Sequence, residues 1–147
     1  MQRLLPPFFF LLCLIAMALL NKFAPIIRFV EYPWNLLGLI DLGGGIAITL
    51  VAGTQFMRVK TNLKTFDKPD QMVTSGLFKY SRNPMYVGFA ISSFGVAFYL
   101  GSLSPFLIFV LFIVVADRWY IAFEEKVMAD VFGEDYENYK RSVRRWI

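Results

Sequence analysis

Two polar clusters stand at the two ends of one long apolar segment of this chain. The first, residues 76–88, brings Arg82 and Asn83 together with a proline, aromatic rings and a glycine. The second is the pair Glu124 and Glu125. Arginine and carboxylate side chains form strong, charge-assisted hydrogen bonds with charged ligands. We therefore predict that the two clusters meet and form a site.

The residue types exclude several kinds of chemistry. The chain has no histidine, which removes the usual general base and most zinc, copper or haem sites. The single cysteine, Cys13, lies in an apolar run, so we expect no disulfide and a place in the core or against lipid. We expect neither a metal nor a nucleic-acid partner.

The composition predicts an integral membrane protein. Hydrophobic residues make up 57% of the chain and charged residues only 18%, too little polar surface for a soluble domain. We predict an all-α, polytopic protein forming a single membrane-embedded domain, residues 1–147, with about four transmembrane helices. Residues 1–57 would supply two of these helices, at 4–20 and 36–57, and residues 73–147 a helical hairpin, broken at 101–105, with C-terminal interfacial helices.

The basic residues predict the orientation. With four crossings, all of the lysines and arginines except Lys22 and Arg28 fall on one side, and that side is the cytoplasm by the positive-inside rule. We thus expect cytoplasmic N- and C-termini, in the inner or plasma membrane if the source is prokaryotic. Residues 16–18 resemble a signal-peptidase site, which leaves a cleaved signal open as an alternative.

Several local features mark helix packing and helix ends. Pro6 and Pro7 suit a helix start, and Pro105 is expected to start the second helix of the hairpin. Residues 43–45, all glycine, are expected to allow close helix contact. Asp41 beside them is a candidate site residue, although anchoring or helix packing is favoured. Residues 58–75 form a surface loop with Leu63, Phe66, Met72 and Val73 as shallow anchors, or a plain linker.

The segment after the hairpin continues past the lipid boundary. Trp119 and Tyr120 are expected in an interfacial aromatic belt, and an apolar stripe continues to Phe132, with Gly133 as a helix stop. A last helix would follow. Its basic residues would lie largely on other faces than its apolar side, and they are Lys140, Arg141, Arg144 and Arg145. The apolar side would consist of Tyr136, Tyr139, Val143, Trp146 and Ile147. This helix either binds anionic lipid or packs over the hairpin mouth.

The combined pattern resembles one family of membrane enzymes. Residues 81–88, the hairpin, Glu124 and Glu125, and residues 132–140 together resemble the isoprenylcysteine carboxyl methyltransferase and phospholipid methyltransferase superfamily. The resemblance covers about residues 73–147. It implies a polytopic enzyme that binds S-adenosylmethionine at the cytoplasmic mouth of a helical pair and methylates a lipophilic acceptor. The usual family signature has histidine where this chain has Asn83, an amide that can donate hydrogen bonds but cannot titrate.

The resemblance and the residue chemistry together give a predicted site. The amino group of the cofactor needs a carboxylate, Glu124 or Glu125, and its carboxylate needs a cation, Arg82 or Arg141. One glutamate is expected to contact the cofactor directly, because adjacent helical residues point about 100° apart. We predict Arg82 and Glu125 as catalytic; the predicted cofactor-binding residues are Asn83, Pro84, Tyr86, Gly88, Glu124, Glu125, Tyr136 and Tyr139.

Other interpretations stay open. Arg82 alone is explained by a positive-inside anchor, Tyr86 by an interfacial aromatic, and the two glutamates by a solvated face or by pairing with Arg118 and Lys126. The acceptor is small or lipophilic, with a carboxylate or thiol slightly favoured over an amine, which needs a base. The alternatives for the whole protein are a membrane reductase resembling sterol reductases, with a nicotinamide cofactor, and a non-catalytic scaffold or lipid-binding protein.

Overall fold

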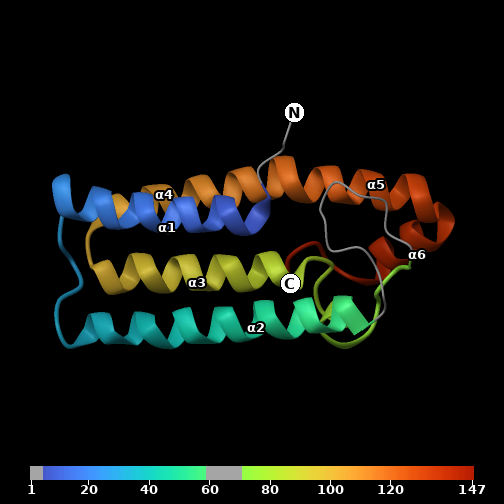
Figure 1. The fold of residues 1–147 in the computed structure, drawn as a ribbon, viewed down its shortest axis with the longest axis horizontal. Coiled ribbons are helices and arrows are strands. Elements are labelled where there is room, and N and C mark those ends of the chain that lie inside the picture. The colour runs from blue at the N-terminus through green and yellow to red at the C-terminus, as the bar shows by residue number, and fades with distance from the viewer. Residues whose placement is uncertain (1–4, 59–70) are drawn as a thin grey trace.

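The computed structural model describes residues 5–58 and 71–147. Helices α1 to α4 lie side by side along the long axis, and α5 carries the chain beyond this bundle to α6 (Figure 1). A π-helical turn, Ala116–Ile121, joins α4 to α5. The all-α prediction is confirmed for the described residues, whose α-helices are α1 (Pro6–Phe23), α2 (Gly38–Arg58), α3 (Pro84–Leu100), α4 (Leu103–Val115), α5 (Ala122–Phe132) and α6 (Glu134–Ser142).

Among the described residues, three helical stretches are long and apolar enough to cross a membrane. They are Pro6–Phe23, Trp34–Arg58 and Leu103–Phe132, with mean hydropathies of 1.8, 1.9 and 2.1. Large apolar side chains on these stretches, such as Leu50, are exposed, as a lipid-facing surface requires. The fourth apolar helix, α3, has 17 residues and is shorter. The polytopic architecture is confirmed, whereas the number of four crossings stays a prediction.

Helix boundaries follow the local signals of proline and glycine. Helix α1 begins at Pro6, in agreement with the predicted helix start, and runs to Phe23, three residues beyond the predicted end. Helix α3 ends at Leu100 and is followed by Gly101, whose φ of 75° favours glycine. The expectation that Pro105 starts the next helix was wrong, because α4 begins at Leu103. Pro105 lies in the first turn, where its missing N–H is not needed.

Glycines bring α2 and α3 into close contact. A Cβ atom at Gly45 would overlap the Gly88 carbonyl oxygen and Ser92, and one at Gly38 would overlap the Gly95 carbonyl oxygen. The predicted close contact therefore holds for Gly45. It was wrong for Gly43 and Gly44, whose added Cβ atoms would meet nothing within 4 Å, because these residues face away from α3. Asp41 lies beside Gly95, as the helix-packing interpretation expects.

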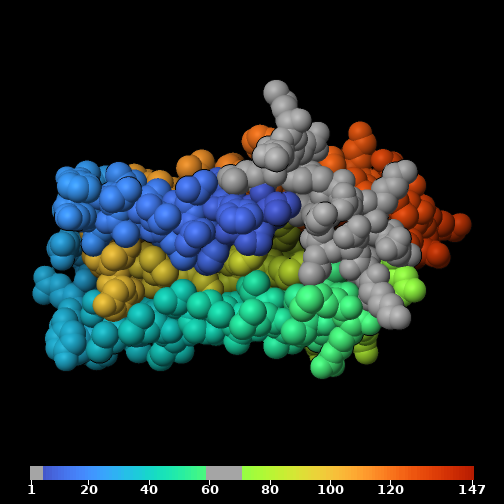
Figure 2. Space-filling view, in the orientation of Figure 1, coloured from blue at the N-terminus to red at the C-terminus, as the bar shows by residue number. Residues whose placement is uncertain are grey.

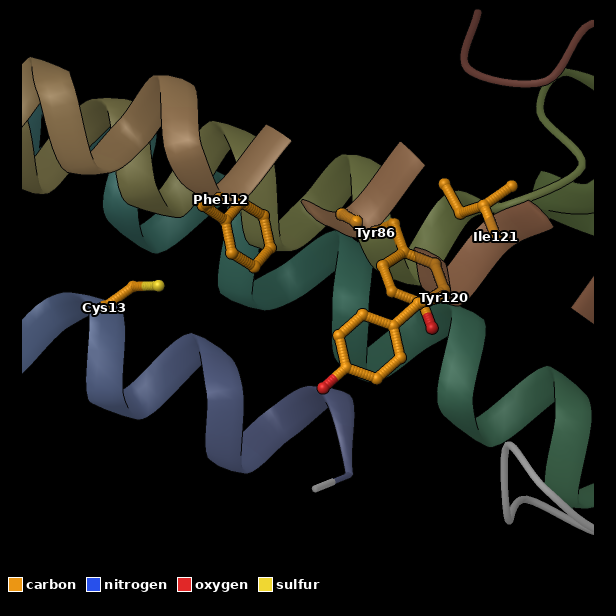
Figure 3. Packing of buried hydrophobic residues seen from close by; sticks show 6 residues of the cluster. Cys13, Tyr86, Phe112, Tyr120 and Ile121 are labelled. Atoms are coloured by element: carbon orange, nitrogen blue, oxygen red, sulfur yellow. The ribbon is translucent and has the colours of Figure 1, made fainter. Parts of the chain in front are cut away.

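A buried cluster joins α1, α3 and the end of α4. Figure 3 shows the Cys13 side chain facing Phe112, and the Tyr86 and Tyr120 rings beside one another near Ile121. The Tyr86 and Tyr120 rings stack with centroids 6.5 Å apart. Cys13 is therefore a core residue. The prediction that Tyr120 belongs to an interfacial belt was wrong, since only 6% of it is exposed, whereas Trp119 is exposed.

The C-terminal segment differs from its prediction. Helix α5 ends at Phe132, and the expected helix stop, Gly133, follows it with a φ of 55°. The following helix, α6, ends at Ser142, and Val143 is extended. Trp146 and Ile147 were thus wrongly expected on its apolar side. The chain leaves the helix there because the backbone beyond Ser142 hydrogen-bonds with the start of α3 instead: the Arg82 N–H donates to the Arg144 carbonyl oxygen at 3.0 Å.

The loop before α3 is only partly described. Leu63 and Phe66, expected as shallow membrane anchors, lie outside the described residues. Val73 is buried with Ala52 and Phe78, so it packs in the protein interior and its prediction as a shallow anchor was wrong. This packing holds the segment before α3 against the end of α2.

Candidate active site

A cavity of about 400 Å³ opens where the start of α1, the end of α2 and the start of α3 meet α5 and α6. Its polar lining includes residues of both sequence clusters and two tyrosines of α6: Arg82, Asn83, Tyr86, Glu124, Glu125, Tyr136 and Tyr139. Its apolar lining includes Pro6, Leu50, Phe56, Met57, Phe78 and Met128. The structure therefore brings the two polar clusters together on one cavity, as the sequence predicted.

The start of α3 places several of the lining residues. Arg82 and Asn83 precede the helix, and the Asn83 backbone is non-helical, with φ of −132° and ψ of 54°. Pro84 is the first helical residue, where the fixed φ of proline suits a helix start. Tyr86 follows in the first turn and lines the cavity with Asn83 and Pro84. The Asn83 side-chain amide donates to the Arg145 carbonyl oxygen at 3.0 Å.

Arg82 and Glu125 form a buried ion pair at the base of the cavity. The distance from Arg82 Nη2 to Glu125 Oε1 is 2.6 Å, and each side chain is 9% exposed. Arg82 Nη1 also donates to the carbonyl oxygens of Lys140 at 2.9 Å and Val143 at 3.0 Å. These contacts join the start of α3 to α5 and α6. A simple surface anchor does not explain them.

Glu125 binds a second arginine that the sequence analysis did not assign to the site. Arg145 Nη2 donates to Glu125 Oε2 at 2.5 Å, and Arg145 Nε donates to Oε1 at 3.2 Å. These hydrogen bonds, with further contacts to Asp117, raise the pKa of Arg145, so it stays cationic. The sequence placed Arg145 among the cations of a last helix that either binds anionic lipid or packs over the hairpin mouth. The signal that marks it is Asp117, a carboxylate at the end of an apolar helix that needs a cation.

Glu124 approaches the cavity from the turn beside Glu125. The Tyr86 hydroxyl donates to Glu124 Oε1 at 2.8 Å, and both residues line the cavity. The proposed pairing of the glutamates with Arg118 is not what the structure shows, because the ion pair recorded for Arg118 is with Asp117. The hydroxyl of Tyr86 therefore orients Glu124, while arginines hold Glu125.

Two tyrosines of α6 close the polar side of the cavity. Tyr136 and Tyr139 are 3% and 9% exposed, so α6 packs over the hairpin mouth. The Tyr139 hydroxyl donates to the Phe78 carbonyl oxygen at 2.6 Å. Burial raises the pKa of Tyr139 to about 12 and raises that of Tyr136 as well. Both phenols are neutral near pH 7 and cannot act there as general bases.

We expect Tyr139→Phe to lower the free energy of unfolding by about 1–3 kcal/mol at pH 7, because the buried Phe78 carbonyl loses its donor. The pKa of Tyr139 is higher in the folded protein than its ordinary value of 10. Its stabilising contribution is therefore complete below pH 10 and is lost as the pH rises from 10 to 12. Thermal unfolding in detergent across this range should show the two proteins converging. A constant difference would contradict the assignment.

Two predicted residues lie away from the cavity lining. Gly88 faces α2, where an added Cβ would overlap Thr49 and the Gly45 carbonyl oxygen. It therefore serves contact between α2 and α3. Arg141, the alternative cation for a ligand carboxylate, is exposed and lies outside the described lining. Arg82 is the arginine that lines the cavity.

An apolar groove leads from the cavity along the bundle. A second hollow of about 190 Å³ lies between α1 and α2 and shares Thr49, Leu50 and Phe89 with the first. The surface of α3 is visible between α1 and α2 in Figure 2. Ile46 and Phe10 line the far part of the groove. The site thus combines a cavity lined by charged side chains with an adjoining apolar groove that lies among the apolar helices.

Comparison with known proteins gives a family and two relatives. The family model for phospholipid methyltransferase matches residues 33–135. A protein-S-isoprenylcysteine O-methyltransferase of Schizosaccharomyces pombe is 31% identical over 117 residues, which cover 78% of this chain and 49% of that protein. An uncharacterized protein of Haemophilus influenzae is 33% identical over 63 residues, which cover 43% of this chain and all of that protein.

This chain spans about half the length of the Schizosaccharomyces pombe relative. No solved structure gives a significant match to the present chain.

Proposed function

We propose that this chain, which belongs to the phospholipid methyltransferase family, is an integral membrane methyltransferase that uses S-adenosylmethionine to methylate a small or lipophilic acceptor at the membrane. The observation that carries this proposal is the cavity lined by Arg82, Glu124 and Glu125 beside the apolar groove. A charged donor and an apolar acceptor need just these two kinds of surface side by side. The family match favours methyl transfer over the reductase and scaffold alternatives.

The donor set of the cavity fits this methyl donor. S-adenosylmethionine carries an amino group, a carboxylate and a cationic sulfur, so it requires both signs of charge. Glu124 and Glu125 supply negative charge, and Arg82 supplies the cation. Both Nη atoms of Arg82 are engaged by protein, whereas its buried Nε has no partner among the described residues. We assign this N–H to the carboxylate of the donor.

The two glutamates receive different roles. Glu125 already accepts three hydrogen bonds from Arg82 and Arg145, and an ionised carboxylate offers about four acceptor positions. The amino group of the donor is assigned to Glu124, whose carboxylate lines the cavity and accepts a hydrogen bond from the Tyr86 hydroxyl. Glu125 keeps Arg82 in place at the cavity wall. The aromatic walls for the adenine ring are Tyr86, Tyr136 and Tyr139.

The protein mainly has to align the reactants and exclude water. S-adenosylmethionine, when bound, supplies a methyl group that its positively charged sulfur has already made electrophilic. The buried tyrosines and the apolar cavity wall shield the site from solvent. An acceptor carboxylate or thiolate arrives as its own nucleophile, whereas a protonated amine must first lose a proton. Glu124 and Glu125 are the carboxylates that line the cavity and can receive it.

We place the acceptor in the groove between α1 and α2, reached from the lipid bilayer. The groove is lined by apolar side chains such as Phe10, Ile46 and Leu50. The names of the family and of the Schizosaccharomyces pombe relative point to two acceptor classes, a phospholipid and an oxygen atom of an S-isoprenylcysteine. Following the basic residues, we place both termini and the cavity on the cytoplasmic side.

We expect Glu124→Gln to reduce methyl transfer by about 10- to 100-fold, the scale of losing one hydrogen bond between charged groups. The assay follows release of S-adenosylhomocysteine by purified protein supplied with either phosphatidylethanolamine or an S-farnesylcysteine derivative. Glu134→Gln, which alters an exposed glutamate of α6, is the matched control and should behave as the wild-type protein. Equal turnover in both variants would contradict the role of Glu124. No turnover with either acceptor class, by protein that binds the donor, would contradict the acceptor assignment.

A further inference from the structure

The last five residues fold back across the start of α3. We name residues 143–147 the C-terminal strap. Its backbone accepts a hydrogen bond from the Arg82 N–H at the Arg144 carbonyl oxygen, 3.0 Å away. The next carbonyl, that of Arg145, accepts from the Asn83 side-chain amide at 3.0 Å. The strap therefore holds two residues that line the cavity.

The side chain of Arg145 reaches a third lining residue. It makes two parallel hydrogen bonds to Glu125, from Nη2 to Oε2 and from Nε to Oε1, the fork geometry in which arginine binds a carboxylate most specifically. Arg145 itself lies outside the described lining of the cavity. Any influence that it has on a ligand must therefore pass through Glu125 and Asn83.

Arg145 is itself fixed from the opposite side. Its Nη1 lies 3.3 Å from Asp117 Oδ1, and Trp146 Nε1 donates to the same oxygen at 2.9 Å. Asp117 belongs to the π-helical turn between α4 and α5. Such turns insert one extra residue, change the direction in which side chains point, and are frequent at functional sites. A carboxylate at the end of an apolar helix is costly unless it is paired, and here the strap pairs it.

We propose that Arg145 is a positioning residue of the methyl-donor site: its side chain holds Glu125 and its carbonyl oxygen holds Asn83, while Asp117, itself held by Trp146, holds the Arg145 guanidinium. This inference rests on the proposed function. It adds a requirement that the cavity residues do not reveal, namely that donor binding depends on a chain of contacts running from the π-helical turn through the strap.

The test measures binding of S-adenosylmethionine to purified full-length protein by calorimetry. Arg145→Gln should weaken binding by about 10- to 100-fold, because Glu125 loses two hydrogen bonds from a charged group. Arg144→Gln is the matched control: it removes the same charge from the neighbouring, exposed position and should bind as the wild-type protein does. Asp117→Asn should weaken binding less. The double variant Asp117→Asn/Arg145→Gln should bind no worse than Arg145→Gln alone, because both changes act through one guanidinium.

A spectroscopic readout separates positioning from general loss of structure. With Trp34 and Trp119 replaced by phenylalanine, Trp146 reports alone, and its emission should move to longer wavelength in Arg145→Gln but not in Arg144→Gln. If Arg145→Gln does not fold, Arg145→Lys takes its place in the test. This variant keeps the positive charge but cannot make two parallel hydrogen bonds to Glu125, so it should still weaken donor binding. Wild-type affinity in Arg145→Gln or Arg145→Lys, or fully additive losses in the double variant, would overturn this inference alone. Failure of the wild-type protein to bind would remove the proposed function and the donor-site role together.

Discussion

Arg82→Ala should abolish donor binding and destabilise the protein. Arg82 is the basic residue among the described cavity-lining residues, so a ligand carboxylate would lose its cation. Removing one partner of a buried ion pair costs up to about 3–5 kcal/mol of stability when the other charge loses all compensation, and we expect a smaller cost here because Arg145 still pairs with Glu125. Arg82 also donates to the carbonyl oxygens of Lys140 and Val143, and these would lose their donor. We expect donor affinity to fall by roughly 100-fold or more, the scale for truncating a buried charge pair.

Donor binding by calorimetry and thermal unfolding in detergent check this prediction. The contacts of Arg82 with α5, α6 and the strap are the reason to measure stability beside affinity. Arg118→Ala serves as control, since the Arg118 side chain is 84% exposed and such surface pairs contribute little. Arg82→Lys keeps the positive charge but lacks the forked guanidinium group. Its donor affinity and unfolding midpoint should therefore lie between those of the wild-type protein and of Arg82→Ala. A folded Arg82→Ala protein with wild-type donor affinity would contradict the site.

Gly45→Ala should destabilise the helix bundle by about 1–3 kcal/mol, the usual cost of overpacking a tight contact. The added Cβ would overlap the Gly88 carbonyl oxygen and the Ser92 backbone nitrogen, and neither backbone atom can move independently of α3. Because α3 begins with residues of the cavity, we expect donor binding to weaken too. The measurement is the midpoint of thermal unfolding, followed by donor titration of the folded fraction.

The neighbouring glycine supplies the control. An added Cβ at Gly44 would meet nothing within 4 Å, and alanine is favoured over glycine in a helix by up to about 1 kcal/mol. Gly44→Ala should therefore unfold at the same temperature as the wild-type protein or slightly above it. Equal midpoints for the two alanine variants would show that the contact between α2 and α3 does not depend on Gly45.

Much of the architecture was predictable because its signals are local. Apolar length marks the spanning helices, Pro6 marks the start of α1, and Gly133 marks the end of α5. The meeting of Arg82 with Glu125 was also predictable, because the hairpin between them returns the chain to the same end of the bundle. These features can be predicted because they depend only on neighbouring residues in the sequence and on the single turn of the hairpin.

The strap and its arginine were not predictable in the same way. No proline or glycine follows Ser142, so the sequence does not show that α6 ends there. The role of Arg145 depends on that end and on the π-helical turn that presents Asp117. In the sequence, Arg145 is one of four cations in the tail and carries no distinguishing neighbour. The burial of Tyr120 likewise depends on how α1 packs, which composition does not reveal.

The most direct test of the central claim is calorimetric titration of the wild-type protein in detergent with three ligands. These are S-adenosylmethionine, S-adenosylhomocysteine and reduced nicotinamide cofactor. The cavity, with Glu124 and Arg82 on one wall, predicts saturable binding of the first two and none of the third. Binding of the nicotinamide cofactor alone, or of none of the three by folded protein, would contradict the claim that this cavity holds a methyl donor.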